Sequence, residues 1–213
     1  MKKTLLTLIS LVSFGFANSQ IKEKGTFEMT PKIGFSRFSE VADHGDTNQN
    51  SGVEFGVTTD YYFSDRWSLR SGLIFDKMGG EYSATAPIDY IYDMYSPPQQ
   101  QYQYYEDKLH YLSIPINANW HFGSTRKWNL NFGLSPSFLL DAKVNNTEMP
   151  KNSIESFQLG LTFGIGYKIE ITQKFGILVD FQGFAGMTNI NKSTPKQIAN
   201  SGSSFNIGGV FDL

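Results

Sequence analysis

Residues 157–169 read FQLGLTFGIGYKI, in which large apolar side chains alternate with small or polar ones. Successive side chains of a β-strand point to opposite faces, so this segment predicts a strand with one continuous apolar face. The opposite face carries Gln158, Thr162 and Lys168, and its other positions are glycines. Such a strand needs an apolar environment on one side and open space on the other.

The same period-2 pattern recurs along the chain, and helical periodicity does not. It predicts eight strands, at residues 26–38, 52–63, 67–78, 109–122, 128–143, 155–169, 175–187 and 203–213. Each is long enough to cross a bilayer at a tilt, which takes roughly 9–11 residues. We therefore expect an all-β fold, an eight-stranded antiparallel up-and-down transmembrane β-barrel formed by residues 20–213.

The connections between these strands alternate in length. Three are short, at residues 64–66, 123–127 and 170–174, and four are long, at residues 39–51, 79–108, 144–154 and 188–202. Outer-membrane barrels have short periplasmic turns and longer external loops. Trp67, Trp120 and Trp128 all lie beside short turns, where a membrane–water boundary favours amphipathic rings. We expect these three rings at one height on the barrel.

The apolar faces are too bulky to fill the interior of a barrel of eight strands, so we expect them to face lipid. The opposite faces would then line the lumen with charges of both signs, at Glu28, Lys32, Glu54, Asp60, Arg70, Asp76, Lys168 and Asp180. The second turn places Asp60 opposite Arg70, which predicts an ion pair inside the barrel. A soluble secreted lipocalin-like binding barrel, with its apolar face inside, is the alternative.

The N-terminus has the layout of a cleaved secretory signal peptide. Lys2 and Lys3 precede an apolar run, and Ala17 and Ser19 occupy the small-residue positions before a cleavage site. We expect residues 1–19 to be removed on export to the cell outer membrane. The chain has no cysteine, which excludes a lipoprotein anchor, disulfides and thiolate metal sites. A net charge of −2 gives no basic surface for nucleic acid.

Several segments resemble the PorT-like family of outer-membrane β-barrel proteins of Gram-negative bacteria. Residues 111–116 are similar to its Tyr-Leu-Glu-Ile-Pro-Leu segment, with Ser113 in place of the acid. Residues 128–137, 163–167 and 183–190 resemble its Gly-x-x-Pro, Gly-x-Gly-Tyr and Gly-Leu-Thr-Asn-Ile segments. The chain departs from the family at residues 179–181, which lack an Arg-Tyr pair, and at its end, where Leu213 follows Phe211 by two positions. The resemblance implies an envelope protein, and some members of the family support protein secretion or gliding.

No residues stand out as catalytic, cofactor-binding or metal-binding. In the expected topology His44 and His110 lie toward the outside and His121 lies at the periplasmic end, so the three histidines do not converge. Asp43, His44 and Asp46 are more typical of a turn than of a metal site. His110 and Ser113 would face opposite sides of a strand. His110 with Glu106 or Asp107 at the outer rim leaves a lipid- or envelope-modifying enzyme as an alternative.

The segment 79–108 holds seven of the 11 tyrosines, at positions 82, 90, 92, 95, 102, 104 and 105. Tyrosine offers a large contact area at a low entropic cost, which suits recognition surfaces. Alternatively, the tyrosines extend the neighbouring hairpins beyond the membrane and pack on one another. Asp89, Asp93, Glu106 and Asp107 make this segment acidic. We therefore expect a non-catalytic outer-membrane protein with a surface-binding, structural or secretion-accessory role. Its expected partners are outer-membrane lipid and a protein or glycan at segment 79–108.

Overall fold

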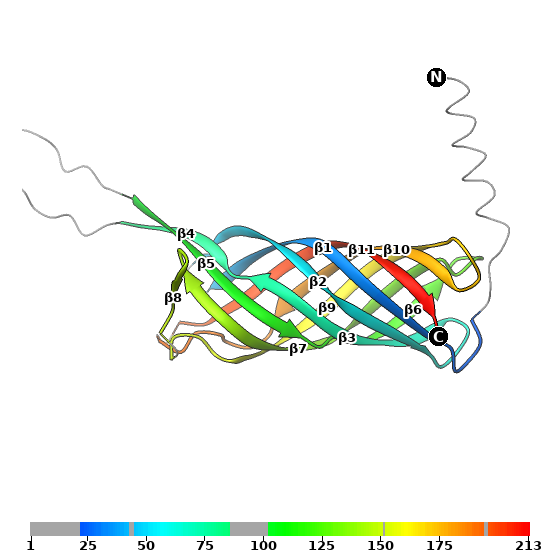
Figure 1. Ribbon diagram of the computed structural model, residues 1–213. Helices are drawn as coiled ribbons and strands as arrows, with labels where there is room; N and C mark the ends of the chain where they lie inside the picture. Colours follow the sequence, from blue (N-terminus) through cyan, green and yellow to red (C-terminus); the bar gives the residue numbers. More distant parts are fainter. Residues whose placement is uncertain (1–21, 43–44, 86–101, 151, 194–195) are drawn as a thin grey trace, which may run out of the picture.

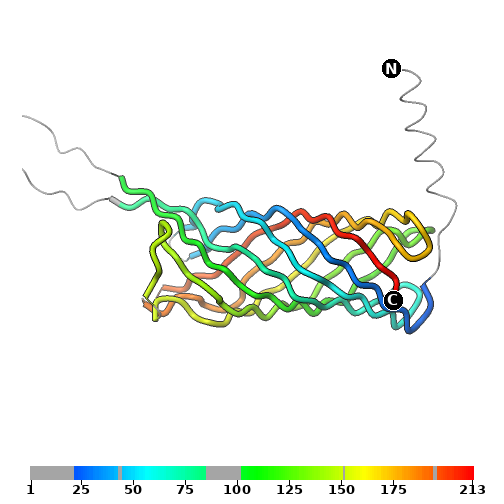
Figure 2. The backbone as a smooth tube through the Cα atoms, viewed as in Figure 1, coloured from blue at the N-terminus to red at the C-terminus, as the bar shows by residue number. Residues whose placement is uncertain are grey.

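The computed structural model describes residues 22–42, 45–85, 102–150, 152–193 and 196–213 (Figure 1). The strands run obliquely around a long, narrow barrel (Figure 2). Its strand segments are β1 (Phe27–Ala42), β2 (Asn48–Tyr62), β3 (Trp67–Met78), β4 (Gly80–Thr85), β5 (Tyr102–Ser113), β6 (Ile116–Phe122), β7 (Trp128–Val144), β8 (Thr147–Glu148), β9 (Phe157–Glu170), β10 (Phe175–Gly186) and β11 (Ile198–Asp212). In these described ranges, no helix is long and apolar enough to cross a membrane.

Antiparallel pairing closes the sheet on itself. The first strand, β1, pairs with β2 on one side and with the last strand, β11, on the other. From β11 the ring continues through β10, β9 and β7, and β7 pairs with both β5 and β6. Those two segments pair with β3, which returns to β2. The predicted all-β antiparallel barrel is therefore confirmed.

The predicted number of strands was wrong, because the structure has eleven strand segments where eight were expected. Pro115 has no backbone N–H to donate, and β5 and β6 are separated at this point. Gly79 separates β3 from β4 with a φ of 109°, and a Cβ atom there would lie 2.2 Å from the backbone oxygen of Asp107. The predicted connection 79–108 was also wrong in part, because β4 and β5 pair as a hairpin within it.

One end of the barrel carries the short turns, at residues 63–66, 123–127 and 171–174, together with the C-terminus (Figure 1). All three tryptophans lie at this end, in a continuous ladder of rings. The centroids of Trp67 and Trp120 are 6.3 Å apart, and Phe122 stands between Trp120 and Trp128 at 5.1 and 6.3 Å. Tyr167 extends the ladder, 4.8 Å from Trp128. The predicted alignment of the three tryptophans is confirmed.

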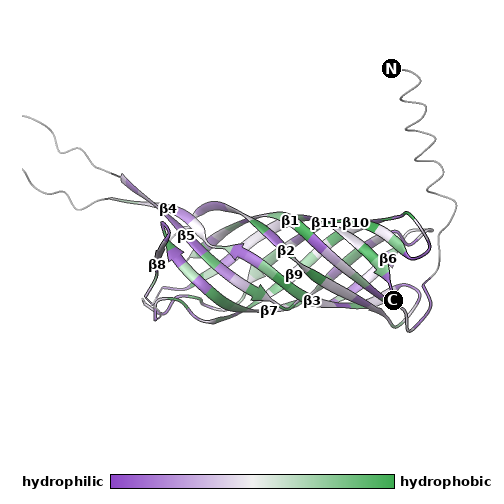
Figure 3. Ribbon diagram, in the orientation of Figure 1, coloured by the Kyte–Doolittle hydropathy of each residue, from purple (hydrophilic) through white to green (hydrophobic). Residues whose placement is uncertain are grey.

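Hydrophobic and hydrophilic residues both occur along the strands of the barrel (Figure 3), and the large apolar side chains point outward. Ile33 is 61% exposed and Phe132 is 51% exposed. Many other large apolar side chains share this surface, among them Phe35, Val53, Phe55, Leu69, Leu73, Phe75, Leu134, Phe138, Leu161, Phe163, Ile165, Phe181, Phe205 and Ile207. We call this surface the apolar belt. It matches the orientation expected of a membrane barrel and is the reverse of the lipocalin-like alternative.

The interior of the barrel is polar. All eight charged residues predicted for the lumen are there: seven are buried, and the side chain of Lys32 is 7% exposed. Isolated charges in such a place are costly unless they are paired or hydrogen-bonded. Lys168 Nζ lies 2.7 Å from Glu28 Oε1, and Lys32 Nζ lies 2.9 Å from Glu54 Oε1. The lumen is therefore filled by a network of mutually neutralising charges.

Asp60 and Arg70 form the centre of this network, as predicted. They are directly opposite each other on β2 and β3, and Arg70 Nε donates to Asp60 Oδ2 at 2.9 Å. The other carboxylate oxygen of Asp60 accepts hydrogen bonds from Ser68 Oγ and Asn119 Nδ2. Arg70 also reaches Asp180 across the lumen, with Nη1 3.7 Å from Oδ2. The guanidinium of Arg70 thus forms ion pairs with two buried carboxylates.

Replacing Arg70 by methionine should leave Asp60 and Asp180 buried without their cation. We expect Arg70→Met to lower the free energy of unfolding by about 3–5 kcal/mol, the usual cost of breaking a buried pair. Asp60→Asn should cost less, because Arg70 keeps Asp180. Urea unfolding in detergent micelles, followed by tryptophan fluorescence, measures both changes. Arg66→Met, in an exposed turn, is the control, and equal small losses for all three variants would contradict the assignment.

Candidate functional site

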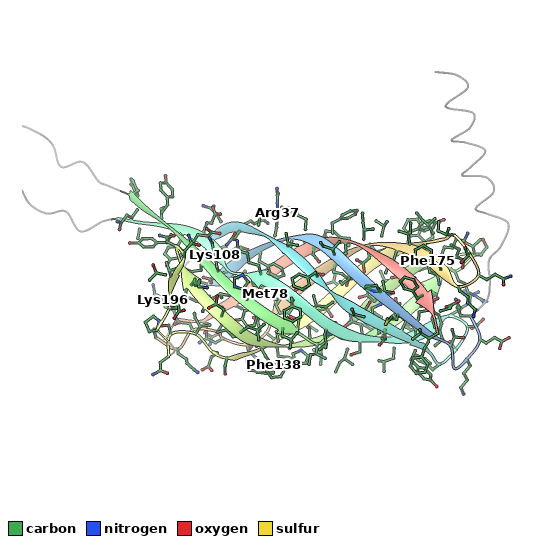
Figure 4. All side chains as sticks on the ribbon, viewed as in Figure 1. Arg37, Met78, Lys108, Phe138, Phe175 and Lys196 are labelled. Atoms are coloured by element: carbon green, nitrogen blue, oxygen red, sulfur yellow. The ribbon has the colours of Figure 1, made fainter. Side chains whose placement is uncertain are left out.

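The barrel continues beyond its apolar belt at the end that carries the long connections, here called the outer end. Arg37 pairs across strands with Ser51, and its guanidinium lies over the ring of Phe35 at 5.7 Å. Lys77, His110 and Asp141 form a similar row across β3, β5 and β7. Figure 4 labels Lys108 nearer to this end of the barrel than the belt residue Phe138. The exterior is therefore polar above the belt.

An apolar cluster fills the interior near this level. Its buried members are Phe38, Met78, Leu109, Tyr111, Phe184 and Ile190, and the rings of Phe38 and Phe184 lie 6.1 Å apart. The sequence signal for this cluster is present but easily missed, since Phe38 and Phe184 interrupt otherwise polar inner faces. It lines the lumen toward the outer end.

Two small cavities lie inside the described part of the barrel. One of about 60 Å³ is bounded by Phe38, Met78 and Phe184 of the apolar cluster and by charged residues such as Lys32. A second, of about 10 Å³, lies beside Glu28 and His121, and Arg70 lines both. The interior of the described residues is thus divided by side chains, and water-sized spaces remain between them.

Two buried carboxyl groups lie in the outer end of the interior. Glu40 points inward from β1 and Asp107 from β5, and they are 6% and 8% exposed. Burial, with a contribution from the nearby Asp107, raises the pKa of Glu40 to about 8. Burial alone raises the pKa of Asp107 to about 6. The sequence prediction of Asp107 as a rim acid beside His110 was wrong, because Asp107 faces the interior.

His110 instead lies on the outer surface beside Asp141, with Nδ1 3.6 Å from Oδ2. Asp141 also forms an ion pair with Lys143 at 2.8 Å. The other predicted partner, Glu106, pairs with Lys77 and Lys108. The acid that β7 brings next to His110 could not be found from sequence spacing, because it is 31 positions away along the chain.

The remaining candidates for chemistry lie apart from His110. Ser113 faces the interior, on the opposite side of β5 from His110 as predicted, and its hydroxyl is 2.8 Å from that of Ser137. His121 is buried at the opposite end of the barrel, with Nε2 3.0 Å from Ser68 Oγ. His44 and Asp43 lie outside the described residues. In the described part of the chain, no group of three or more His, Asp and Glu side chains is arranged to ligate a metal.

The β4–β5 hairpin extends past the rest of the barrel at the outer end (Figure 1). Its strands pair from Glu81 opposite Glu106 to Thr85 opposite Tyr102. Tyr82 stacks on Tyr105 with centroids 5.4 Å apart, and Tyr102 and Tyr104 are 58% and 80% exposed. Tyrosine therefore both stabilises the hairpin and provides solvent-exposed rings on it. Tyr90, Tyr92, Tyr95, Asp89 and Asp93 lie outside the described residues.

Solved structures of similar shape are outer-membrane proteins. OprG from Pseudomonas aeruginosa shares 10% identity over 90% of this chain and 97% of its own, with a TM-score of 0.49. Neisserial surface protein A shares 16% identity over 86% and 94%, with a TM-score of 0.48. Ail from Yersinia pestis, in complex with the heparin analogue sucrose octasulfate, shares 11% over 88% and 99%, with a TM-score of 0.44.

A search of curated protein sequences finds no match to this chain. A protein family does match it: the family described as "Outer membrane protein beta-barrel domain" covers residues 16–192. This range contains every strand of the barrel except β11. The chain therefore belongs to the family of outer membrane protein β-barrel domains, and its apolar belt contacts the lipid of that membrane.

Proposed function

We propose that this chain is a non-catalytic surface-binding protein of the PorT-like type in the outer membrane of a Gram-negative bacterium. The observation that carries the proposal is the β4–β5 hairpin, which places exposed tyrosine rings beyond the apolar belt. Export would use residues 1–19 as a cleaved signal peptide, consistent with the basic start and apolar run there. The short turns would then lie in the periplasm and the hairpin outside the cell.

We further infer that the eleven segments cross the membrane eight times. The β4 segment continues β3 after Gly79, and β5 and β6 share one position between β3 and β7. The short β8 pairs only with the end of β7, above the belt. Eight crossings leave an interior just wide enough for side chains, which agrees with the small cavities around Arg70. A binding role at the surface is therefore favoured over transport through the lumen.

The hairpin offers the chemistry of a glycan or protein recognition surface. Tyr102 and Tyr104 expose flat rings with hydroxyl groups, which stack on sugar faces or apolar side chains while donating hydrogen bonds. Glu81 adds an acid at the base of the hairpin, where Glu106 is already paired with lysines. This combination favours a neutral or basic partner over an anionic one.

Removing the exposed rings should abolish recognition without unfolding the barrel. We expect Tyr102→Ala/Tyr104→Ala to lose at least about tenfold in binding, the effect of removing roughly 1.4 kcal/mol of contact energy. Protein in lipid nanodiscs would be tested on an array of purified surface polysaccharides and on immobilised cationic peptides. Tyr61→Ala, at the opposite end of the barrel, is the control. Unchanged binding by the double variant would refute the hairpin as the recognition surface.

A second candidate function is a rim-sited enzyme acting on lipid or envelope substrates, since His110 and Asp141 are adjacent on the exterior. The non-catalytic proposal is favoured because Ser113, the nearest serine of β5, faces the interior. His110 could act as a general base only on a proton within hydrogen-bond reach, and the Ser113 hydroxyl lies on the other side of the strand.

The two candidate functions predict different lipid A compositions of the membrane. If the protein is not an enzyme, mass spectrometry should find the same lipid A in cells that lack the protein, in wild-type cells and in His110→Ala cells. A lipid A species that requires the wild-type protein and disappears in His110→Ala cells would establish the enzyme instead. Lys196→Ala, in another external connection, controls for effects of altered surface charge.

A further inference from the structure

Two fully enclosed oxygen atoms at the outer end of the interior, Asp107 Oδ1 and Asn200 Oδ1, have no hydrogen-bond partner among the described residues. The side chain of Asn200 is completely buried, as is that of Tyr111, whose hydroxyl interacts with the Asn200 side chain. Buried polar atoms are nearly always hydrogen-bonded, so an unpaired group calls for a bound water or ion. Asp107, Asn200 and Tyr111 belong to one neighbourhood, at the level of Glu40.

Glu40 lies close to the groups that carry these atoms. It lies directly opposite Asn200 in the β1–β11 register, and both side chains point inward. It interacts electrostatically with Asp107 and with Tyr82 and Tyr111. We call Glu40, Asp107, Tyr111 and Asn200 the outer acid cluster. Gly79 and Gly80 allow the close approach, because their Cβ positions would overlap Asp107 and Thr47.

The outer acid cluster lacks a positive charge. Neither Glu40 nor Asp107 forms an ion pair with any described residue, whereas Glu28, Glu54 and Asp60 deeper in the barrel do. Lys77 contacts Asn50 beside the cluster, but its ammonium group is engaged by Asn50 Oδ1, the Ser51 carbonyl and Glu106. Asn50 uses its amide to donate to the backbone oxygen of Asp107, at 3.0 Å. The two carboxyl groups must therefore hold protons or bind a cation.

We propose that the outer acid cluster is a calcium site, with Glu40 and Asp107 as its charged ligands. Every free donor in the cluster is an oxygen, and oxygen ligands select hard cations over zinc or copper. Two carboxylates balance the charge of one Ca²⁺, and its coordination accepts amide oxygens and water in irregular geometry. Mg²⁺ demands a near-ideal octahedron, so it fits a cluster drawn from β1, β5 and β11 less well.

Calcium at this position would brace the base of the β4–β5 hairpin. Asp107 belongs to β5 immediately below the hairpin, and Glu40 and Asn200 belong to β1 and β11 on the opposite part of the wall. A site with only two charged ligands is expected to bind in the range of extracellular calcium modules, about 0.1–1 mM. The proposal does not depend on what the hairpin binds.

If Glu40 and Asp107 hold protons instead of a cation, the stability of the protein should depend on pH but not on calcium. Both folded-state pKa values are raised, so each buried carboxyl group favours the folded state below its unfolded value near 4. That stability is lost as the pH rises through about 6 for Asp107 and about 8 for Glu40. If calcium binds, it should restore stability at high pH and have no effect where the carboxyl groups are protonated.

The test measures thermal unfolding of the full-length protein in detergent micelles at about pH 5 and about pH 9, in EDTA or in about 10 mM CaCl₂. In EDTA we expect lower stability at the higher pH. Calcium should shift the unfolding equilibrium by about 10- to 100-fold at the higher pH and negligibly at the lower. The same concentration of MgCl₂ should have a smaller effect. Calorimetric titration with CaCl₂ measures the binding directly.

Two charge-removing variants locate the site. Glu40→Gln and Asp107→Asn should bind no calcium, and in EDTA at high pH they should be at least as stable as the wild type, because each removes a buried charge. Glu148→Gln, an exposed acid at the same end, should bind calcium normally. Calcium binding that survives in both variants overturns the assignment. A wild type whose loss of stability at high pH is the same with and without calcium shows that the cluster holds protons only.

Discussion

Apolar and polar side chains alternate along each strand, and this imposes one constraint on the whole molecule. The apolar side chains face lipid, so the polar ones must be accommodated in a narrow lumen. A charge enclosed in such a space is tolerated only when an opposite charge or several hydrogen bonds neutralise it. Arg70 meets this requirement for Asp60 and Asp180, and Lys168 meets it for Glu28. These pairs connect β2 and β3 to β10, and β1 to β9, across the interior. The barrel is therefore held by hydrogen bonds around its wall and by ion pairs through its centre.

The polarity and charge of the side chains that line the interior change along the axis of the barrel. Beside the short turns it is ionic and hydrogen-bonded, as at His121 and Ser68. Toward the outer end it becomes apolar at the cluster that contains Phe38 and Phe184, and then acidic at Glu40 and Asp107. Glu28, Glu54, Asp60 and Asp180 form ion pairs inside the lumen, whereas Glu40 and Asp107 form none with the described residues. The paired carboxylates stabilise the barrel as ions, whereas Glu40 and Asp107 would hold protons or, as proposed, a calcium ion.

The outer end combines a rigid base with an exposed surface. The hairpin continues the antiparallel pairing of the wall, so its tyrosines are supported by β4 and β5 rather than by an irregular loop. Stacking of Tyr82 on Tyr105 stiffens it further, while Tyr104 remains exposed. A recognition surface held in this way loses little conformational entropy when it binds. Ion binding at Asp107 would add to this rigidity from within the barrel.

The sequence alone determined the barrel class, the positions of most strands and the direction in which each face points. It also gave the Asp60–Arg70 pair and the height of the three tryptophans, because period-2 alternation and a short turn fix the register of neighbouring strands. It did not reveal the division of the strands at Gly79 and Pro115, the acid beside His110, or the meeting of Glu40 with Asp107. Those features join residues far apart in the chain. They depend on how a tilted sheet closes, since closure sets which heights on distant strands coincide, and no local pattern carries that information.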